Sequence, residues 1–294
     1  MDEKIIEKYK KSGEIAKRSK KLAREIVKPG ESYLNICSKI RDEILKSGGK
    51  SAFPVNISVN EIAAHDVATH DDKRIVSEND LVKIDIGVHV DGYIADTALS
   101  FCWNDKHKKL IEASKEGLKA AIDIIKPGVT LSAVGKAIED AIKSYGYNSI
   151  KNLSGHEVEE YDLHSGFTVP NYDNKSNVKI EEGMALAIEP FATSGKGFII
   201  ETKASDIFAI EHVPSLRSPN SRKLFDFIFE EYQTLPFAKR WLYEKFKPFE
   251  VASGFIELRK YLKNYPNLKE ETNEPVSQAE DTVLVLGSGN IKTT

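Results

Sequence analysis

The feature that most constrains the fold is a helix–turn–helix pattern that occurs twice, 98 positions apart. In the first copy Pro29-Gly30 ends a helix and Ser32 caps the next, and Pro127-Gly128 and Thr130 hold the same places in the second. Composition alone would give roughly one or two identities over such a window. Residues 27–48 and 125–146 share seven, which are Lys28/Lys126, Pro29/Pro127, Gly30/Gly128, Ile40/Ile138, Asp42/Asp140, Ile44/Ile142 and Gly48/Gly146. We therefore expect two related halves, each a helix pair followed by strands, with a site at their shared interface.

Strand patterns follow each expected helix pair, which indicates an α+β fold. The first helix should span residues 2–27, and alternating apolar residues on both sides of Asp91-Gly92 predict a hairpin over 81–101. Residues 206–275 break the pattern, and their two aromatic-rich helical stretches predict a compact helical insertion within a single domain, 1–294. The remaining expected elements are strands at 185–188, 197–204 and 280–286, with 288–294 completing or trailing the last one, and insertion helices at 221–232 and 236–246.

Composition excludes several classes of protein. The chain has 42 basic and 45 acidic residues and a net charge of -3, which argues against DNA binding through bulk charge. No apolar run approaches the length of a membrane span, and the charged N-terminus has no signal-peptide core. Cys37 and Cys102 are too few for a disulfide scaffold. We expect both to be reduced thiols in a cytoplasmic protein that is a monomer.

Two aspartates on the expected hairpin are candidate metal ligands. If Asp91-Gly92 forms a two-residue turn, Asp85 faces Ala98 and Asp96 faces Gly87. The two aspartates then share one face, with Cβ atoms about 7 Å apart among mostly apolar residues. Carboxylates in that position repel each other unless a cation lies between them. The alternative is a pair of solvent-facing aspartates on an edge hairpin, and this feature alone favours neither.

A histidine and two glutamates extend the candidate site. Glu189 ends an apolar strand pattern and Glu280 opens the last one, although a lone glutamate at a strand end is usually solvated. His65, His156 and His164 stand among small or polar residues, and each alone is more often structural. Two Asp, two Glu and one His on strands of both halves suit a pair of divalent ions of the Mn, Fe or Co type better than a Cys-rich structural zinc.

Long strings of the sequence resemble the methionine aminopeptidase family over essentially the whole chain. The segment 222–244 looks like the insertion of the type II branch, and the short N-terminal region is similar to that of archaeal members. The matching strings are FPVNISVNEIAAH (53–65), KIDIGVHVDGYIADTA (83–98), NLSGHEVEEYDLHSG (152–166), AIEPFATSGKG (187–197) and a late Glu280.

The resemblance implies a pita-bread fold of two pseudo-symmetric halves and a ligand set for two divalent ions of the Co, Mn, Fe, Zn or Ni class. By this resemblance Asp85 chelates one metal and Asp96 and Glu280 bridge both, while His156 and Glu189 bind the second. His65 and His164 match two histidines near the substrate that bind no metal. Residues that match the methionine pocket are Phe53, Pro54, Leu163, Phe191 and, less closely, Tyr265.

The family implies removal of the initiator methionine from nascent chains, with a small second residue preferred and the ribosome as a possible place of action. By the same resemblance, a hydroxide held by the metals would attack the first peptide carbonyl, Glu189 would move the proton, His164 would stabilise the oxyanion and His65 would position the amide. One departure is Ala279-Glu280-Asp281-Thr282, where related enzymes often read F-E-H-T. The alternatives are a proline-specific peptidase of the same fold, which usually has a further N-terminal domain, and a non-catalytic relative that binds ribosomes, RNA or proteins.

Overall fold

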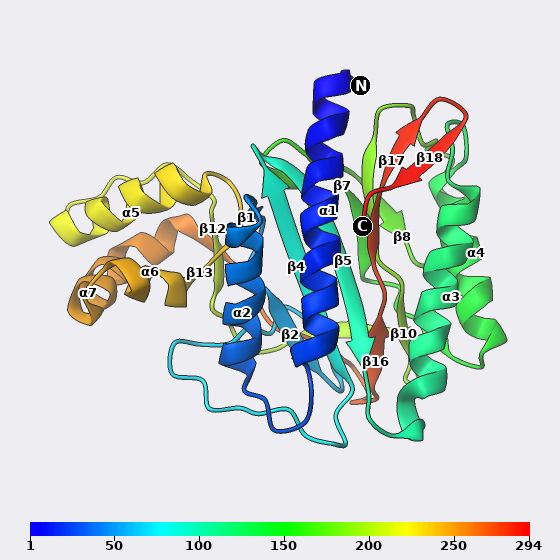
Figure 1. Cartoon of the computed structure of the whole chain (residues 1–294), viewed down its shortest axis with the longest axis horizontal. Helices are drawn as coiled ribbons and strands as arrows, with labels where there is room; N and C mark the ends of the chain where they lie inside the picture. The colour runs from blue at the N-terminus through cyan, green and yellow to red at the C-terminus, as the bar shows by residue number, and fades with distance from the viewer.

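A computed structural model describes residues 1–294, and Figure 1 shows a layer of strands with long helices packed against it. Helix α1 lies over strands β4 and β5 and α2 packs beside it against β1 and β2, while α3 and α4 cover the other end of the strand layer. Each helix is amphipathic; in α2, for example, Ile36, Ile40 and Ile44 are completely buried. Burial of each such side chain contributes about 1.5–3 kcal/mol to stability. These helices are α1 (Glu3–Ile26), α2 (Tyr33–Lys46), α3 (Lys108–Ile124) and α4 (Leu131–Ser144).

The structure confirms the repeat. Helices α2 and α4 begin and end 98 positions apart, and so do β1 (Lys50–Ser51) and β6 (Asn148–Ser149). The Ser32 hydroxyl accepts from the Asn35 amide, and the Thr130 hydroxyl accepts from the Ala133 amide, so the caps correspond as well. Gly30 and Gly128 have φ of 86° and 89°, which explains why both copies need glycine there.

The first half is built on the predicted hairpin. Strands β4 (Val82–Val90) and β5 (Tyr93–Phe101) pair in the expected register, with Asp85 opposite Ala98 and Gly87 opposite Asp96. The turn residues Asp91 and Gly92 both have positive φ, as a tight hairpin requires. Strands β1 and β2 (Asn56–Val59) pair with β4 to complete this sheet.

The second half contains a five-stranded antiparallel sheet in the order β18-β17-β9-β7-β8. Residues 289–292 turn back on β17 as a hairpin partner, so they do not merely trail it. A single bridge between Ala98 and Glu280 joins this sheet to β5. The strands are β7 (Ser154–Glu159), β8 (Asp162–Pro170), β9 (Ala185–Ile188), β17 (Asp281–Leu286) and β18 (Gly289–Lys292).

Three small sheets connect the halves and the segment that follows β11. Within the expected strand 197–204 only β11 (Ile199–Glu201) forms, and it pairs with β15 (Leu268–Glu270), which also pairs with β3 (Ile62–Ala64). Gly197 precedes it with φ of 81°, a conformation that ends extended pairing. The other short strands are β10 (Phe191–Thr193), β12 (Ile207–Ile210), β13 (Phe237–Ala238), β14 (Leu262–Asn264) and β16 (Val276–Gln278).

Both helices expected inside 206–275 are present, together with a third that the sequence pattern did not predict. They extend away from the strand layer in Figure 1 and share a hydrophobic cluster that includes Phe237, Trp241 and Phe255. The helices are α5 (Pro219–Tyr232), α6 (Lys239–Lys245) and α7 (Pro248–Leu258).

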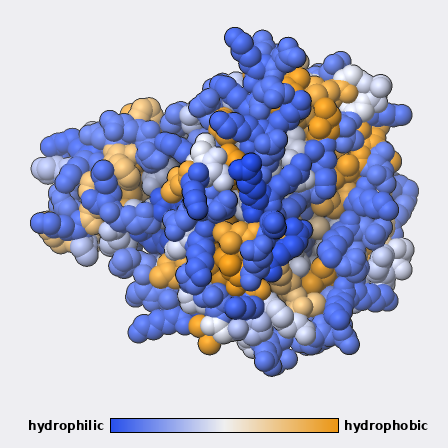
Figure 2. All heavy atoms as spheres, in the orientation of Figure 1, coloured by the Kyte–Doolittle hydropathy of each residue, from blue (hydrophilic) through white to orange (hydrophobic).

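The outer surface is mainly polar. In Figure 2 the visible face is largely hydrophilic, and its hydrophobic residues gather in separate patches between the helices. None of the helices combines the length and the apolar content that crossing a bilayer requires. Cys37 and Cys102 are both free thiols, as expected.

Substitution of Gly13 tests the packing of α1 against the last strand hairpin. A Cβ atom at this position would overlap the carbonyl group of Thr293. Alanine favours an isolated helix by roughly 1 kcal/mol over glycine, whereas forced overpacking costs about 1–3 kcal/mol. We expect Gly13→Ala to lower the free energy of unfolding in urea, and Glu14→Ala, at an exposed position of the same helix, to leave it unchanged or higher. Equal stability of the two variants would contradict this packing.

Candidate metal centre and active site

A cavity of about 280 Å³ opens between the two halves, and it collects almost all of the residues that the sequence singled out. Its walls come from the hairpin, from strands β7–β9 of the second half and from both ends of the inserted segment. The candidate residues that line it are Phe53, His65, Asp85, Asp96, His156, Leu163, His164, Glu189, Phe191, Tyr265 and Glu280. Pro54 does not line the cavity. It is buried behind the wall, where its carbonyl accepts a hydrogen bond from Asn56 Nδ2 at 2.8 Å.

Asp85 and Asp96 reach the cavity from one face of the hairpin, as their register predicts. Burial raises the pKa of Asp85 to about 7. Burial, followed by the charges of Asp85 and Glu189, raises the pKa of Asp96 well above its usual range. One carboxylate oxygen of each aspartate is buried without a hydrogen-bond partner. The solvent-facing alternative is therefore wrong, and the hairpin presents acceptor oxygens that lack a positive partner.

Glu280 enters the cavity from the residue just before β17. Burial and the neighbouring carboxylates of Asp96 and Asp85 raise its pKa. Gln278, two residues earlier, donates from Nε2 to Glu280 Oε2 at 3.2 Å. The sequence reasoning missed Gln278, although residues two apart in a strand share a face and Glu280 had been marked.

A break in the register of β7 turns His156 toward the carboxylates. The pairing of β7 with β8 shifts between His156 and Glu157, and such bulges re-aim side chains. The Glu157 carbonyl can only accept, so His156 Nδ1, at 3.3 Å, carries the proton and Nε2 offers a lone pair. Nε2 lies 3.6 Å from both Asp96 Oδ2 and Glu189 Oε1. Burial lowers the pKa of His156 to about 4, which keeps the ring neutral.

This donor set fits a divalent cation. An unprotonated imidazole nitrogen that faces two carboxylates is repulsive until a positive charge lies among them. Ligand atoms of Asp96, His156 and Glu280 all lie within 4.8 Å of one another. Asp85 and Glu189 adjoin this cluster in the same cavity. Oxygen donors with one nitrogen and no thiolate suit Mn, Fe or Co.

His65 and His164 lie in the cavity beside this cluster. His65 has φ of 63°, a strained conformation for a non-glycine residue, and its Nδ1 lies 3.1 Å from the Pro266 carbonyl. That contact places the proton on Nδ1 and leaves Nε2 as an acceptor, and burial lowers the pKa of the ring to about 4. The rings of His164 and His156 are 4.5 Å apart, edge to face. The pKa of His164 is lowered by lost hydration and then by the neighbouring His156 and His65.

An apolar wall closes the other part of the cavity. Phe53, Leu163 and Phe191 are each less than 10% exposed, and Phe53 lies against Gly87, where any Cβ would overlap the ring. Ile207 and Pro236 add apolar surface from the inserted segment. Neither was expected from the sequence, because nothing local marks an isoleucine or a proline in an insertion as part of a distant cavity.

Comparison with known proteins identifies the class of enzyme. Residues 7–213 match the model of metallopeptidase family M24, so this chain belongs to that family. The methionine aminopeptidase of Pyrococcus abyssi is 42% identical over 98% of this chain and 99% of its own. That of Archaeoglobus fulgidus is 40% identical over the full length of both chains. The chain is therefore a member of the methionine aminopeptidase family, a metalloexopeptidase and a hydrolase.

Solved structures agree on the fold. A thermophilic Arx1 superposes with a TM-score of 0.84 at 15% identity, covering 100% of this chain and 91% of that chain. Methionine aminopeptidase from Thermotoga maritima superposes with a TM-score of 0.73 at 21% identity, covering 100% and 98%. Sequence identities this low allow conclusions about the fold alone. The superpositions confirm the predicted pita-bread architecture.

Removal of one cavity carboxylate tests the metal centre. We expect Mn²⁺ or Co²⁺ to raise the melting temperature of the wild-type chain and EDTA to reverse the rise, because a cation relieves repulsion among buried carboxylates. Asp85→Asn should keep the far-UV circular dichroism and lose most of this metal-dependent rise. Glu157→Gln, beside His156 but outside the cavity, is the matched control. Full metal stabilisation in Asp85→Asn would contradict the site.

Proposed function

We propose that this chain hydrolyses the peptide bond after an N-terminal methionine, with nascent proteins in the cytoplasm as natural substrates. The observation that carries the proposal is a buried set of carboxylates and one imidazole directly beside a closed apolar wall, in a member of this family. Such a cavity admits the end of a chain with an apolar side chain. We also assign residues 1–294 to one catalytic domain with 206–275 as a type II insertion subdomain, which is supported by its own hydrophobic cluster.

The ligands for two divalent ions would be the five residues that meet in the cavity. When bound, divalent ions polarise a carbonyl and lower the pKa of water so that it can attack at neutral pH. The ligands assigned are Asp85, Asp96, His156, Glu189 and Glu280.

Glu189 is the residue that moves the proton. Burial, with the neighbouring charge of Asp85, raises its pKa in the metal-free chain, and a carboxylate within reach of the attacking water can act as a general base. Its backbone is fixed because Asn171 Nδ2 donates to its carbonyl at 3.1 Å. Glu189 takes a proton from the attacking water and delivers it to the amine that leaves.

The two other histidines act on the substrate. His65 Nε2 accepts a hydrogen bond from the scissile amide, since its Nδ1 proton is committed to Pro266. His164, an exposed residue of β8 that lines the cavity, donates to the developing oxyanion as a neutral imidazole. Phe53, Leu163 and Phe191 enclose the methionine side chain, with Tyr265 beside both histidines. The limited volume around them favours a small second residue.

Two assays separate this function from its alternatives. We expect hydrolysis of Met-Ala-Ser, loss of activity with a chelator and recovery with Co²⁺ or Mn²⁺, and little hydrolysis of an X-Pro dipeptide. Preference for the X-Pro substrate would identify a proline-specific peptidase. No hydrolysis of either substrate by the metal-loaded protein would identify a non-catalytic relative.

Glu189→Gln separates the two roles assigned to this residue. The amide oxygen can still coordinate but cannot accept a proton, so kcat should fall by about 10²–10⁴-fold, the range for loss of general acid–base help. At least one metal should remain bound, as measured by mass spectrometry of the intact protein. Normal turnover in this variant would assign the proton transfer to another group.

Replacement of His164 and of His156 by alanine, one at a time, tests their different roles. His164→Ala should keep its metal and lose mainly kcat, because an oxyanion donor acts in the transition state. His156→Ala should lose metal and activity together. If His164→Ala loses metal while His156→Ala keeps it, the two assignments are reversed.

A further inference from the structure

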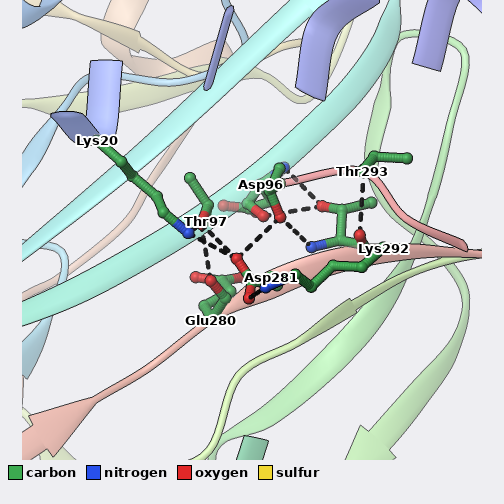
Figure 3. A network of polar contacts seen from close by, with 9 residues as sticks. Lys20, Asp96, Thr97, Glu280, Asp281, Lys292 and Thr293 are labelled. Atoms are coloured by element: carbon green, nitrogen blue, oxygen red, sulfur yellow. Dashed lines mark hydrogen bonds and ion pairs between the residues drawn. The ribbon is translucent and has the colours of Figure 1, made fainter. Parts of the chain in front are cut away.

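A buried charge network lies behind the metal centre, on the opposite face of the strands that carry Asp96 and Glu280 (Figure 3). Side chains alternate along an extended strand, so Thr97 and Asp281 point away from the cavity. There they meet Lys20 of α1. The side chains of Lys20 and Asp281 are only 12% and 6% exposed.

Asp281 is bonded at both carboxylate oxygens. Lys20 Nζ lies 2.6 Å from Oδ1 and Lys292 Nζ lies 2.9 Å from Oδ2. The Thr294 hydroxyl donates to Oδ1 at 3.0 Å. Loss of one partner from a buried pair leaves an uncompensated charge, which makes this geometry costly to disturb.

Lys20 also begins a chain of hydrogen bonds that reaches the backbone of Glu280. Lys20 Nζ donates to Thr97 Oγ1 at 2.9 Å, and Thr97 Oγ1 lies 2.7 Å from the Glu280 carbonyl. The Thr97 hydroxyl also lies 3.2 Å from Asp281 Oδ1, but the Glu280 carbonyl, at 2.7 Å, is the nearer acceptor for its one proton. Thr282, the residue after Asp281, makes a second link between the strands. Its Oγ1 accepts a hydrogen bond from the Asp96 amide at 2.7 Å and donates one to the Asp96 carbonyl at 2.8 Å.

The backbone alone holds these two strands weakly at this point. Ala98 and Glu280 form an isolated bridge whose hydrogen bonds measure 3.3 and 3.2 Å. The spacing between Asp96 and Glu280 therefore depends on side chains that cross from one strand to the other.

We propose that Lys20 is a positioning residue for the metal centre. Asp281 holds the Lys20 ammonium group in place, and through Thr97 this group fixes β5 against the start of β17 and so fixes the distance between the Asp96 and Glu280 carboxylates. This inference rests on the proposed function, because it takes these two carboxylates as metal ligands. Removal of the ligands' supporting partners typically costs 10–100-fold in metal affinity.

Charge alone makes the opposite prediction. An ammonium group behind the site repels a divalent cation, so its removal without any change in position should tighten metal binding. The sign of the change in affinity therefore distinguishes positioning from simple electrostatics.

The test is calorimetric titration of Co²⁺ into the metal-free full chain, with the Co²⁺ absorption spectrum as a second measure of ligand geometry. Lys20→Met and Thr97→Val, which keeps the volume but lacks the hydroxyl, should each weaken Co²⁺ binding by about 10–100-fold and alter the spectrum. Lys20→Arg and Thr97→Ser retain the donors and should bind nearly as the wild type does. Lys292→Met is the matched control, since Lys292 contacts Asp281 but not Thr97.

Unchanged or tighter binding in folded Lys20→Met and Thr97→Val would overturn the inference. A loss in Lys292→Met equal to that in Lys20→Met would overturn it as well, because Lys292 has no contact with Thr97. If Lys20→Met fails to fold, Thr97→Val decides the question. A wild-type chain that binds no Co²⁺ would instead overturn the proposed function, so the two failures are distinguishable.

Discussion

Mutual repulsion among buried carboxylates is the constraint around which the rest of the structure is organised. Asp85, Asp96, Glu189 and Glu280 are brought together from separate segments into one cavity, and burial raises the pKa of all four. Such a cluster persists only if the surrounding fold is rigid enough to hold it until a cation binds. Two buried and mainly aliphatic cores, one between the hairpin and helices α1 and α2 and one in the second half, supply that rigidity.

The fold could be predicted from the sequence wherever a local rule applied. The Pro-Gly stops, the capping residues and the Asp91-Gly92 turn each act within a few residues, so the matched helices and the register of β4 with β5 follow from them. The face shared by Asp85 and Asp96 follows from that register. The ligand roles and the pocket residues came from resemblance to a family, since spacing alone did not select among the histidines.

What the sequence did not reveal depends on contacts between distant segments. Helix α7 and the walls provided by Ile207 and Pro236 depend on how the inserted segment folds back on the body. Gln278 could have been found from strand alternation. The position of Pro54 outside the cavity could not have been predicted, because it depends on the path of the backbone beside Asn56. Asp281 departs from the related F-E-H-T pattern. Its role as the partner of Lys20 could not be predicted, because the two residues are more than 250 positions apart in the sequence.

The residues proposed as metal ligands are widely separated along the chain, which has a consequence for folding. Asp85 and Asp96 lie in the first third of the sequence, whereas Glu280 comes close to its end. Contacts of such long range form late in folding, because loop closure must precede them. The carboxylate cluster therefore cannot assemble before the segment that carries Glu280 has joined β5. A chain that stops before Glu280 lacks one of the four buried carboxylates and also the bridge to Ala98 that joins the two halves.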